Sequence, residues 1–156
     1  MIKTEIEVEG LEELEKRLLA ISADMAGKNV RNSLMKAGKV VFDDMKANVK
    51  TGNVTRKVKT DKGGTVTISP GFLKSRIKRR SRLNRTGQAR GFKGDSIVSV
   101  SIGVYKVPYV AAVEYGAANR GVRAQPFIRR ALENNVDQVI STFKADLKRR
   151  LDEGIA

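Results

Sequence analysis

The apolar residues of this chain recur with two different periods, and the order of those periods limits the fold more than any other sequence feature. Ile2, Ile6 and Val8 alternate with charged neighbours, which is typical of a strand with one buried face. From Leu11 the spacing becomes helical, and it later returns to alternation. Because the strands and helices do not alternate regularly, we predict an α+β fold, in which a small antiparallel or mixed sheet is packed by two N-terminal helices and one long C-terminal helix.

The first half of the chain contains signals for two helices and a hairpin. The first helix begins at Leu11, has acids in its first turn and is expected to end near Gly27. A second apolar stripe runs from Val30 to Val49 and stops at the breaker Thr51–Gly52–Asn53. Residues 54–58 and 65–68 then form a predicted β-hairpin around the turn 61–64.

The second half begins with the clearest strand pattern, over residues 97–104. A short helix is expected over residues 109–115 with Gly116 as its cap. Pro126 suits the first position of a helix, because proline lacks the N–H that would be unsatisfied there. The stripe from Leu132 to Leu151 predicts one long final helix.

Composition excludes several classes of site. The 156 residues include no Cys and no His, so zinc fingers, Ser-His-Asp triads and Cys-His pairs are excluded. A chain of this length can bury a sufficient core as a single domain, residues 1–156, and we expect neither a metal nor another cofactor. No apolar run reaches the length of a membrane span and the first ten residues lack a signal-peptide pattern, so a soluble, unexported protein without a membrane partner is expected.

The carboxylates offer little support for catalysis. The pairs Glu12–Glu13 and Asp43–Asp44 fall on the polar faces of the expected helices. Glu114 lies between apolar neighbours, where it could act as a general base, but a structural residue paired with an arginine is the preferred interpretation. Gly63–Gly64 lacks the Lys-Ser/Thr of a phosphate-binding loop. We therefore predict that the protein is not an enzyme.

Positive charge is concentrated in one segment. Thirteen Lys and Arg residues and one acid lie between Arg56 and Lys93, and they account for twelve of the net fourteen positive charges. Few apolar residues follow Phe72, so residues 70–94 are expected to form a mobile basic loop, with at most one short helical turn near Leu73–Ile77. Few aromatic residues accompany the run. Electrostatic binding to phosphates or to an acidic protein surface is therefore favoured over sequence-specific recognition of nucleic acid. The candidate interaction residues are Lys74, Arg76, Lys78, Arg79, Arg80, Arg82, Arg85, Arg90 and Lys93.

Two runs near the C-terminus carry a family resemblance. Residues 108–116, PYVAAVEYG, are followed by residues 124–133, AQPFIRRALE. Together they resemble the signature of the head–tail joining (tail-completion, neck) proteins of long-tailed bacteriophages and prophages. The segment 8–14 and the break 49–53, which lacks the family's usual Pro, are also similar, and residues 71–77 are a second candidate for that break. The matching signature residues are Pro108, Tyr109, Val113, Glu114, Tyr115, Gly116, Gln125, Pro126, Phe127 and Ala131.

The resemblance implies a structural virion component. Proteins of this family are ring subunits, expected here as a hexamer, that join the capsid connector to the tail. The implied partners are other copies of the chain, the tail tube or its terminator and the head connector, with non-specific DNA contact as a further expectation. The implied location is the neck or tail of the virion, and the host cytoplasm during assembly. The alternative interpretation is a small basic nucleic-acid-binding protein.

Overall fold

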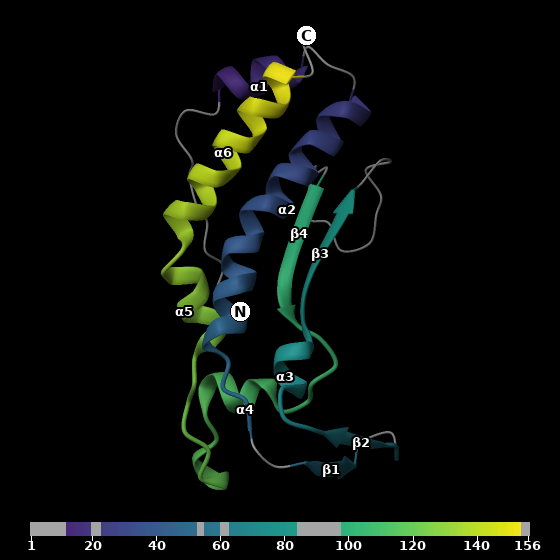
Figure 1. Ribbon diagram of the computed structural model, residues 1–156, viewed down its shortest axis with the longest axis vertical. Coiled ribbons are helices and arrows are strands. Elements are labelled where there is room, and N and C mark those ends of the chain that lie inside the picture. Colours follow the sequence, from purple (N-terminus) through teal and green to yellow (C-terminus); the bar gives the residue numbers. More distant parts are fainter. Residues whose placement is uncertain (1–11, 20–22, 53–54, 60–62, 84–97, 154–156) are drawn as a thin grey trace. The chain divides into compact units, whose positions relative to one another are not determined.

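The computed structural model describes residues 12–19, 23–52, 55–59, 63–83 and 98–153 (Figure 1). These residues form six α-helices, one 3₁₀ helix and four strands, which confirms the α+β class. In chain order the elements are α1 (Glu12–Leu19), α2 (Ala23–Asn48), β1 (Arg56–Lys59), β2 (Thr65–Ile68), α3 (Phe72–Ser75), β3 (Ile77–Leu83), β4 (Val98–Val104), α4 (Val110–Tyr115), η1 (Ala118–Arg120), α5 (Phe127–Glu133) and α6 (Val136–Glu153). The expected N-terminal strand over residues 2–8 lies outside the described residues.

The chain divides into two compact units. Unit 1 comprises Met1–Val40, Arg80–Ser101 and Val136–Ala156, and unit 2 comprises Val41–Arg79 and Ile102–Asn135. The elements α2, β3 and β4 each contribute residues to both units. The expectation of a single domain stays a prediction.

Unit 1 has a core built from the expected helical stripes. Leu14 of α1 is buried in a cluster with Leu147 and Leu151 of α6. Val30 of α2 and Phe143 of α6 are partly buried against the same cluster. Burial of these large aliphatic side chains explains why α1 forms a helix although it has only eight residues, a length that is marginal in isolation.

Unit 2 contains the predicted hairpin. Strand β1 pairs antiparallel with β2, with Arg56 opposite Ile68 and Lys59 opposite Thr65. The described strands form two separate two-stranded sheets, because β3 and β4 pair only with each other (Figure 1).

Within the described residues, no helix has the length and apolar character required to cross a membrane.

The basic segment differs from the expected loop within residues 72–83. Residues 72–83 form α3 and β3, in which Leu73 is 8% exposed and Ile77 is 1% exposed. Burial alternates along β3, so that Lys78, Arg80 and Arg82 are exposed while the residues between them are less exposed. Helix α3 confirms the expected short helical turn near Leu73, whereas the prediction of a mobile loop is wrong over β3, because long cationic side chains can supply the exposed face of a strand. The remainder, residues 84–93 with Arg85, Arg90 and Lys93, lies outside the described residues.

Two helix boundaries also differ from expectation. Gly27 is buried inside α2 and does not end a helix, so tertiary packing overrides its low helix propensity. The expected long final helix is divided into α5 and α6 at Asn134–Asn135. The Asn135 side chain donates to the Ala131 carbonyl at 2.8 Å, while the Asn135 backbone N–H donates to Leu132 instead. This competition by an asparagine side chain for a helical carbonyl breaks the hydrogen-bond ladder.

The burial of Ile77 gives a direct test of the packed β3 strand. We expect Ile77→Ala to lower the free energy of unfolding by about 2–5 kcal/mol, because it leaves a cavity at a fully buried site. The control Lys78→Ala changes an exposed neighbour on the same strand and should shift stability by less than about 0.5 kcal/mol. Urea unfolding followed by circular dichroism measures both, and equal stabilities for the two variants would contradict the assignment of Ile77 to the core.

Candidate functional site

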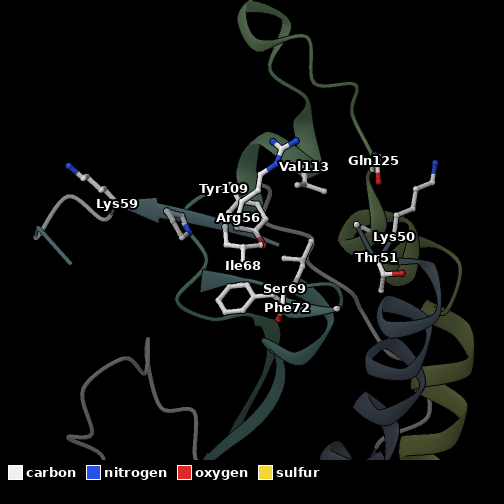
Figure 2. Close-up of a pocket in the computed structure, with 14 residues that line it drawn as sticks. Lys50, Thr51, Arg56, Lys59, Ile68, Ser69, Phe72, Tyr109, Val113 and Gln125 are labelled. Atoms are coloured by element: carbon white, nitrogen blue, oxygen red, sulfur yellow. The ribbon is translucent and has the colours of Figure 1, made fainter. Parts of the chain in front are cut away.

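Segments that carry the family resemblance meet around one pocket of unit 2. Its volume is about 580 Å³, and it is open to solvent (Figure 2). Thr51 and Gly52 from the break after α2, Pro108, Tyr109 and Val113 around α4, and Gln125 all line it. The other lining residues are Lys50, Arg56, Lys59, Ile68, Ser69, Gly71, Phe72 and Leu73. We call this site the unit 2 pocket.

Local backbone signals position the α4 side of the pocket. Pro108 precedes α4, and the helix ends, as predicted, at Gly116 with φ of 81°. A Cβ at this position would lie 3.0 Å from the Ala124 backbone nitrogen and 3.1 Å from the Val122 carbonyl oxygen. The close return of the chain requires glycine here, and the Gln125 N–H then donates to the Val113 carbonyl at 2.7 Å.

The pocket has a positive and partly apolar lining. Lys50, Arg56 and Lys59 are exposed, and no Asp or Glu is found among the described lining residues. Burial raises the pKa of the Tyr109 phenol above its ordinary value, so this hydroxyl remains a hydrogen-bond donor at neutral pH. The pocket can therefore hold an anionic group beside an apolar one.

Glu114 has a structural position next to this pocket. The residue is 3% exposed, and its carboxylate accepts hydrogen bonds from the backbone N–H groups of Ile128 and Arg129, each at 3.0 Å. These N–H groups belong to the first turn of α5, which has no intrahelical acceptor for them. The Arg129 Nε also lies 3.4 Å from the carboxylate, which confirms the expected pairing of Glu114 with an arginine.

The last residue of α4 and the loop after it present exposed apolar side chains. Tyr115 is 64% exposed, and the Arg129 guanidinium lies 5.0 Å from its ring centroid. Ala117 and Val122 form an isolated antiparallel bridge across η1, and Val122 is 37% exposed. The same guanidinium therefore links the buried Glu114 to an exposed aromatic surface.

The remaining signature residues are structural. Phe127 is 3% exposed and Ala131 is fully buried, so both belong to the core of unit 2. Pro126 is the N-cap of α5, one position before the helix position predicted for it. The small boundary difference leaves its role at the start of the helix unchanged.

The predicted interaction cations that the structure describes, from Lys74 to Arg82, do not line the unit 2 pocket, although Arg56 and Lys59 of the same basic stretch do. The Arg76 guanidinium lies 4.8 Å from the ring centroid of Phe72, and Arg79 lies 5.7 Å from that of Phe42. Lys74, Lys78, Arg80 and Arg82 are exposed on α3 and β3. The structure thus brings together the signature residues, but it does not bring the predicted interaction cations to the same site.

Unit 1 contains a charged cluster that the sequence analysis missed. Asp146 of α6 has a side chain only 1% exposed, and it pairs with Lys36 at 2.8 Å, Arg149 at 3.0 Å and Arg150 at 2.6 Å. Ser33 donates to it at 3.1 Å. The spacing of Asp146 from Arg149 and Arg150 was a usable signal for local ion pairs, but it gave no indication of burial.

Asp146 is held in its charged form. Burial alone raises the pKa of this carboxyl, but the hydrogen bonds from Lys36, Arg150, Arg149 and Ser33 outweigh burial and lower the pKa well below its ordinary value. The cluster is a saturated ion-pair network rather than a reactive acid. Among the described residues, no group of three or more carboxylates is arranged to hold a metal ion.

Comparisons with protein-family models, with curated proteins and with solved structures find no match to this chain.

The Glu114 contacts predict a measurable stability loss. We expect Glu114→Ala to lower the free energy of unfolding by about 1–3 kcal/mol, because the Ile128 and Arg129 amides lose their acceptor. Glu133→Ala, which removes an exposed acid from α5, is the matched control and should have an effect below about 0.5 kcal/mol. Chemical denaturation compares the two; a Glu114 variant as stable as the control would exclude the capping role.

The Asp146 network predicts a specific pH dependence. Because the folded-state pKa lies below the unfolded value of about 3.9, the charged Asp146 stabilises the fold above about pH 4. This contribution is lost as the pH falls through the lowered folded-state pKa. Asp146→Asn should therefore lower stability near pH 7 and flatten its decline below pH 4, relative to Asp152→Asn at an exposed acid. Unfolding midpoints measured from pH 7 to acid test this, and parallel pH profiles would contradict it.

Proposed function

We propose that this protein is a non-enzymatic ring subunit of the neck of a long-tailed bacteriophage or prophage, where it completes the tail and joins it to the capsid connector. The observation that carries the proposal is where the residues of the family signature lie in the structure. Thr51–Gly52, Tyr109–Val113 and Gln125 are separated in sequence, yet they line one pocket. Glu114 then ties the same region to the start of α5. The residues that resemble the family signature thus lie close together around one pocket, although they are separated in sequence.

The surface after α4 supports assembly with other copies. Ring subunits meet through two different faces, and such contacts need apolar or aromatic groups on a stiff support. Tyr115 is exposed at the end of α4, and Val122 is exposed on the following loop, which is closed by the Ala117–Val122 bridge. The restricted backbone at Gly116 holds the two arms of this loop together. We propose this loop as one face of the subunit contact.

The proposed setting is the virion neck, reached from the host cytoplasm during assembly. The proposed neighbours are the tail tube or its terminator and the head connector, and the ring is proposed to be a hexamer. Non-specific contact with DNA is an additional proposal.

A second candidate function has one specific observation in its favour. Lys78, Arg80 and Arg82 alternate as exposed residues along β3, so their charges are presented together on one side of a strand. Such a row would suit a small basic protein that contacts nucleic-acid phosphates without reading sequence. Binding to duplex DNA over a salt series separates the two functions, because phosphate binding weakens steeply with salt.

The ring proposal predicts that assembly depends on the exposed loop. The isolated protein should sediment mainly as a monomer and form rings on the ends of tail tubes from the encoding phage, as seen by electron microscopy. The double variant Tyr115→Ala/Val122→Ser should reduce ring-capped tubes by about tenfold or more, since truncation of central aromatic contacts often costs over 2 kcal/mol.

Leu19→Ser is the matched control, because it removes an apolar side chain that is also exposed but belongs to α1. It should leave ring formation unchanged. A stable twofold dimer that buries the loop and persists in particles would contradict the ring, and a hydrolytic activity lost in a folded Glu114→Gln variant would contradict the non-enzymatic assignment.

A further inference from the structure

The cations of the unit 2 pocket surround side chains of a different character. Lys50, Arg56 and Lys59 are exposed, whereas Leu73 is buried and Phe72 is partly buried. Figure 2 shows Lys59 and Lys50 on opposite sides of the view, with Arg56 between them. Charge therefore borders an apolar interior from more than one side.

The charge of the lining favours a carboxylate-bearing ligand. No acid is found among the described lining residues, so a bound carboxylate would add the opposite charge that the lining lacks. The protonated Tyr109 phenol and the hydroxyl groups of Thr51 and Ser69 can each donate a hydrogen bond to it. Charge-assisted hydrogen bonds of this kind are stronger than neutral ones.

The apolar part of the lining restricts the ligand further. A phosphate backbone would meet the cations but would leave Phe72, Leu73 and Val113 without apolar contacts. A volume of about 580 Å³ accommodates a few side chains, within the size range of sites that bind small organic groups. An amphipathic ligand, apolar at its centre and acidic at its ends, fits both features.

An extended peptide provides that arrangement. Side chains two positions apart in an extended chain point to the same side, and five residues span about 13 Å. An apolar side chain can then enter the pocket while the acids two positions before and after it reach cations on opposite sides. The pattern acid–x–apolar–x–acid matches the lining better than a run of acids.

We propose that the unit 2 pocket binds an extended segment of a partner protein in which a large apolar side chain is flanked, two positions away on each side, by carboxylates. This inference goes beyond the proposed function, because it concerns the isolated protein and does not require a ring.

The test uses a fluorescein-labelled synthetic peptide, Gly-Glu-Ser-Phe-Ser-Glu-Gly, and fluorescence anisotropy with the full chain. Lys50→Gln/Lys59→Gln should weaken binding about tenfold, because two cations of the lining are lost. Lys57→Gln/Lys74→Gln is the matched control. It removes the same net charge from exposed lysines of unit 2 that do not line the pocket, and it should weaken binding less than about twofold.

Two further probes separate the contributions of charge and apolar contact. A peptide with Gln in place of both Glu residues, and one with Ser in place of Phe, should each bind about tenfold more weakly to the unchanged protein. All four substituted lysines are exposed, so folding should be preserved, and thermal unfolding verifies this. If a double variant is destabilised, Lys59→Gln against Lys57→Gln repeats the comparison with single changes on strand β1.

Three results would overturn the proposal. The first is the absence of peptide binding to the unchanged protein. The second is an equal loss in both double variants, which would indicate general attraction by net charge. The third is tighter binding of a labelled oligothymidylate that depends on Lys50 and Lys59, which would assign the pocket to single-stranded nucleic acid. None of these results alters the ring test, which depends on Tyr115 and Val122.

Discussion

The two carboxylate oxygens of Glu114 fasten the end of α4 to the first turn of α5. A buried amide without an acceptor is more costly than a typical hydrogen bond is favourable, so the Ile128 and Arg129 N–H groups strongly restrict where the carboxylate can lie. The same helix α4 places Val113 against the pocket, and the Val113 carbonyl accepts from Gln125. The pocket wall and the exposed Tyr115 therefore both depend on one buried acid.

The elements that could be predicted from sequence are those whose signals are local. The sequence of β4, VSVSIGV, alternates between apolar and small residues over its whole length. The β1–β2 hairpin needs only a turn with Gly63, whose φ is 76°. Gly116 ended a predicted helix because few other residues adopt its φ of 81°. Glu114 is an acid among apolar neighbours with no partner suited to catalysis in the sequence, and this pattern favours a structural ion pair. These inferences succeeded because each required only a few neighbouring residues.

The features that could not be predicted depend on contacts between residues far apart in the sequence, or on cationic residues that form part of a packed strand. Asp146 resembles a surface acid by its spacing from Arg149 and Arg150, and its burial depends on Ser33 and Lys36, more than one hundred positions away. The sequence of β3 predicts a loop because it contains few apolar residues. The alternating burial of this strand is not visible in the sequence, since Arg79 and Ser81 occupy two of its less exposed positions. The pocket itself could not be identified, since its cations Lys50, Arg56 and Lys59 have no distinguishing motif.

The positive charge of the chain is thus divided among different physical roles, and this changes how its net charge of +14 should be interpreted. Lys36, Arg149 and Arg150 stabilise one buried acid, and Arg149 also pairs with Glu153, so part of their charge is compensated where it lies. The cations of β3 supply the exposed side of a strand, and Arg76 and Arg79 lie over aromatic rings. The cations of the pocket instead border apolar side chains, and Lys50 lies outside the most basic stretch of the sequence. Because screened interactions act over about 10 Å, a binding site is defined by which charges the fold brings together and not by their density along the chain.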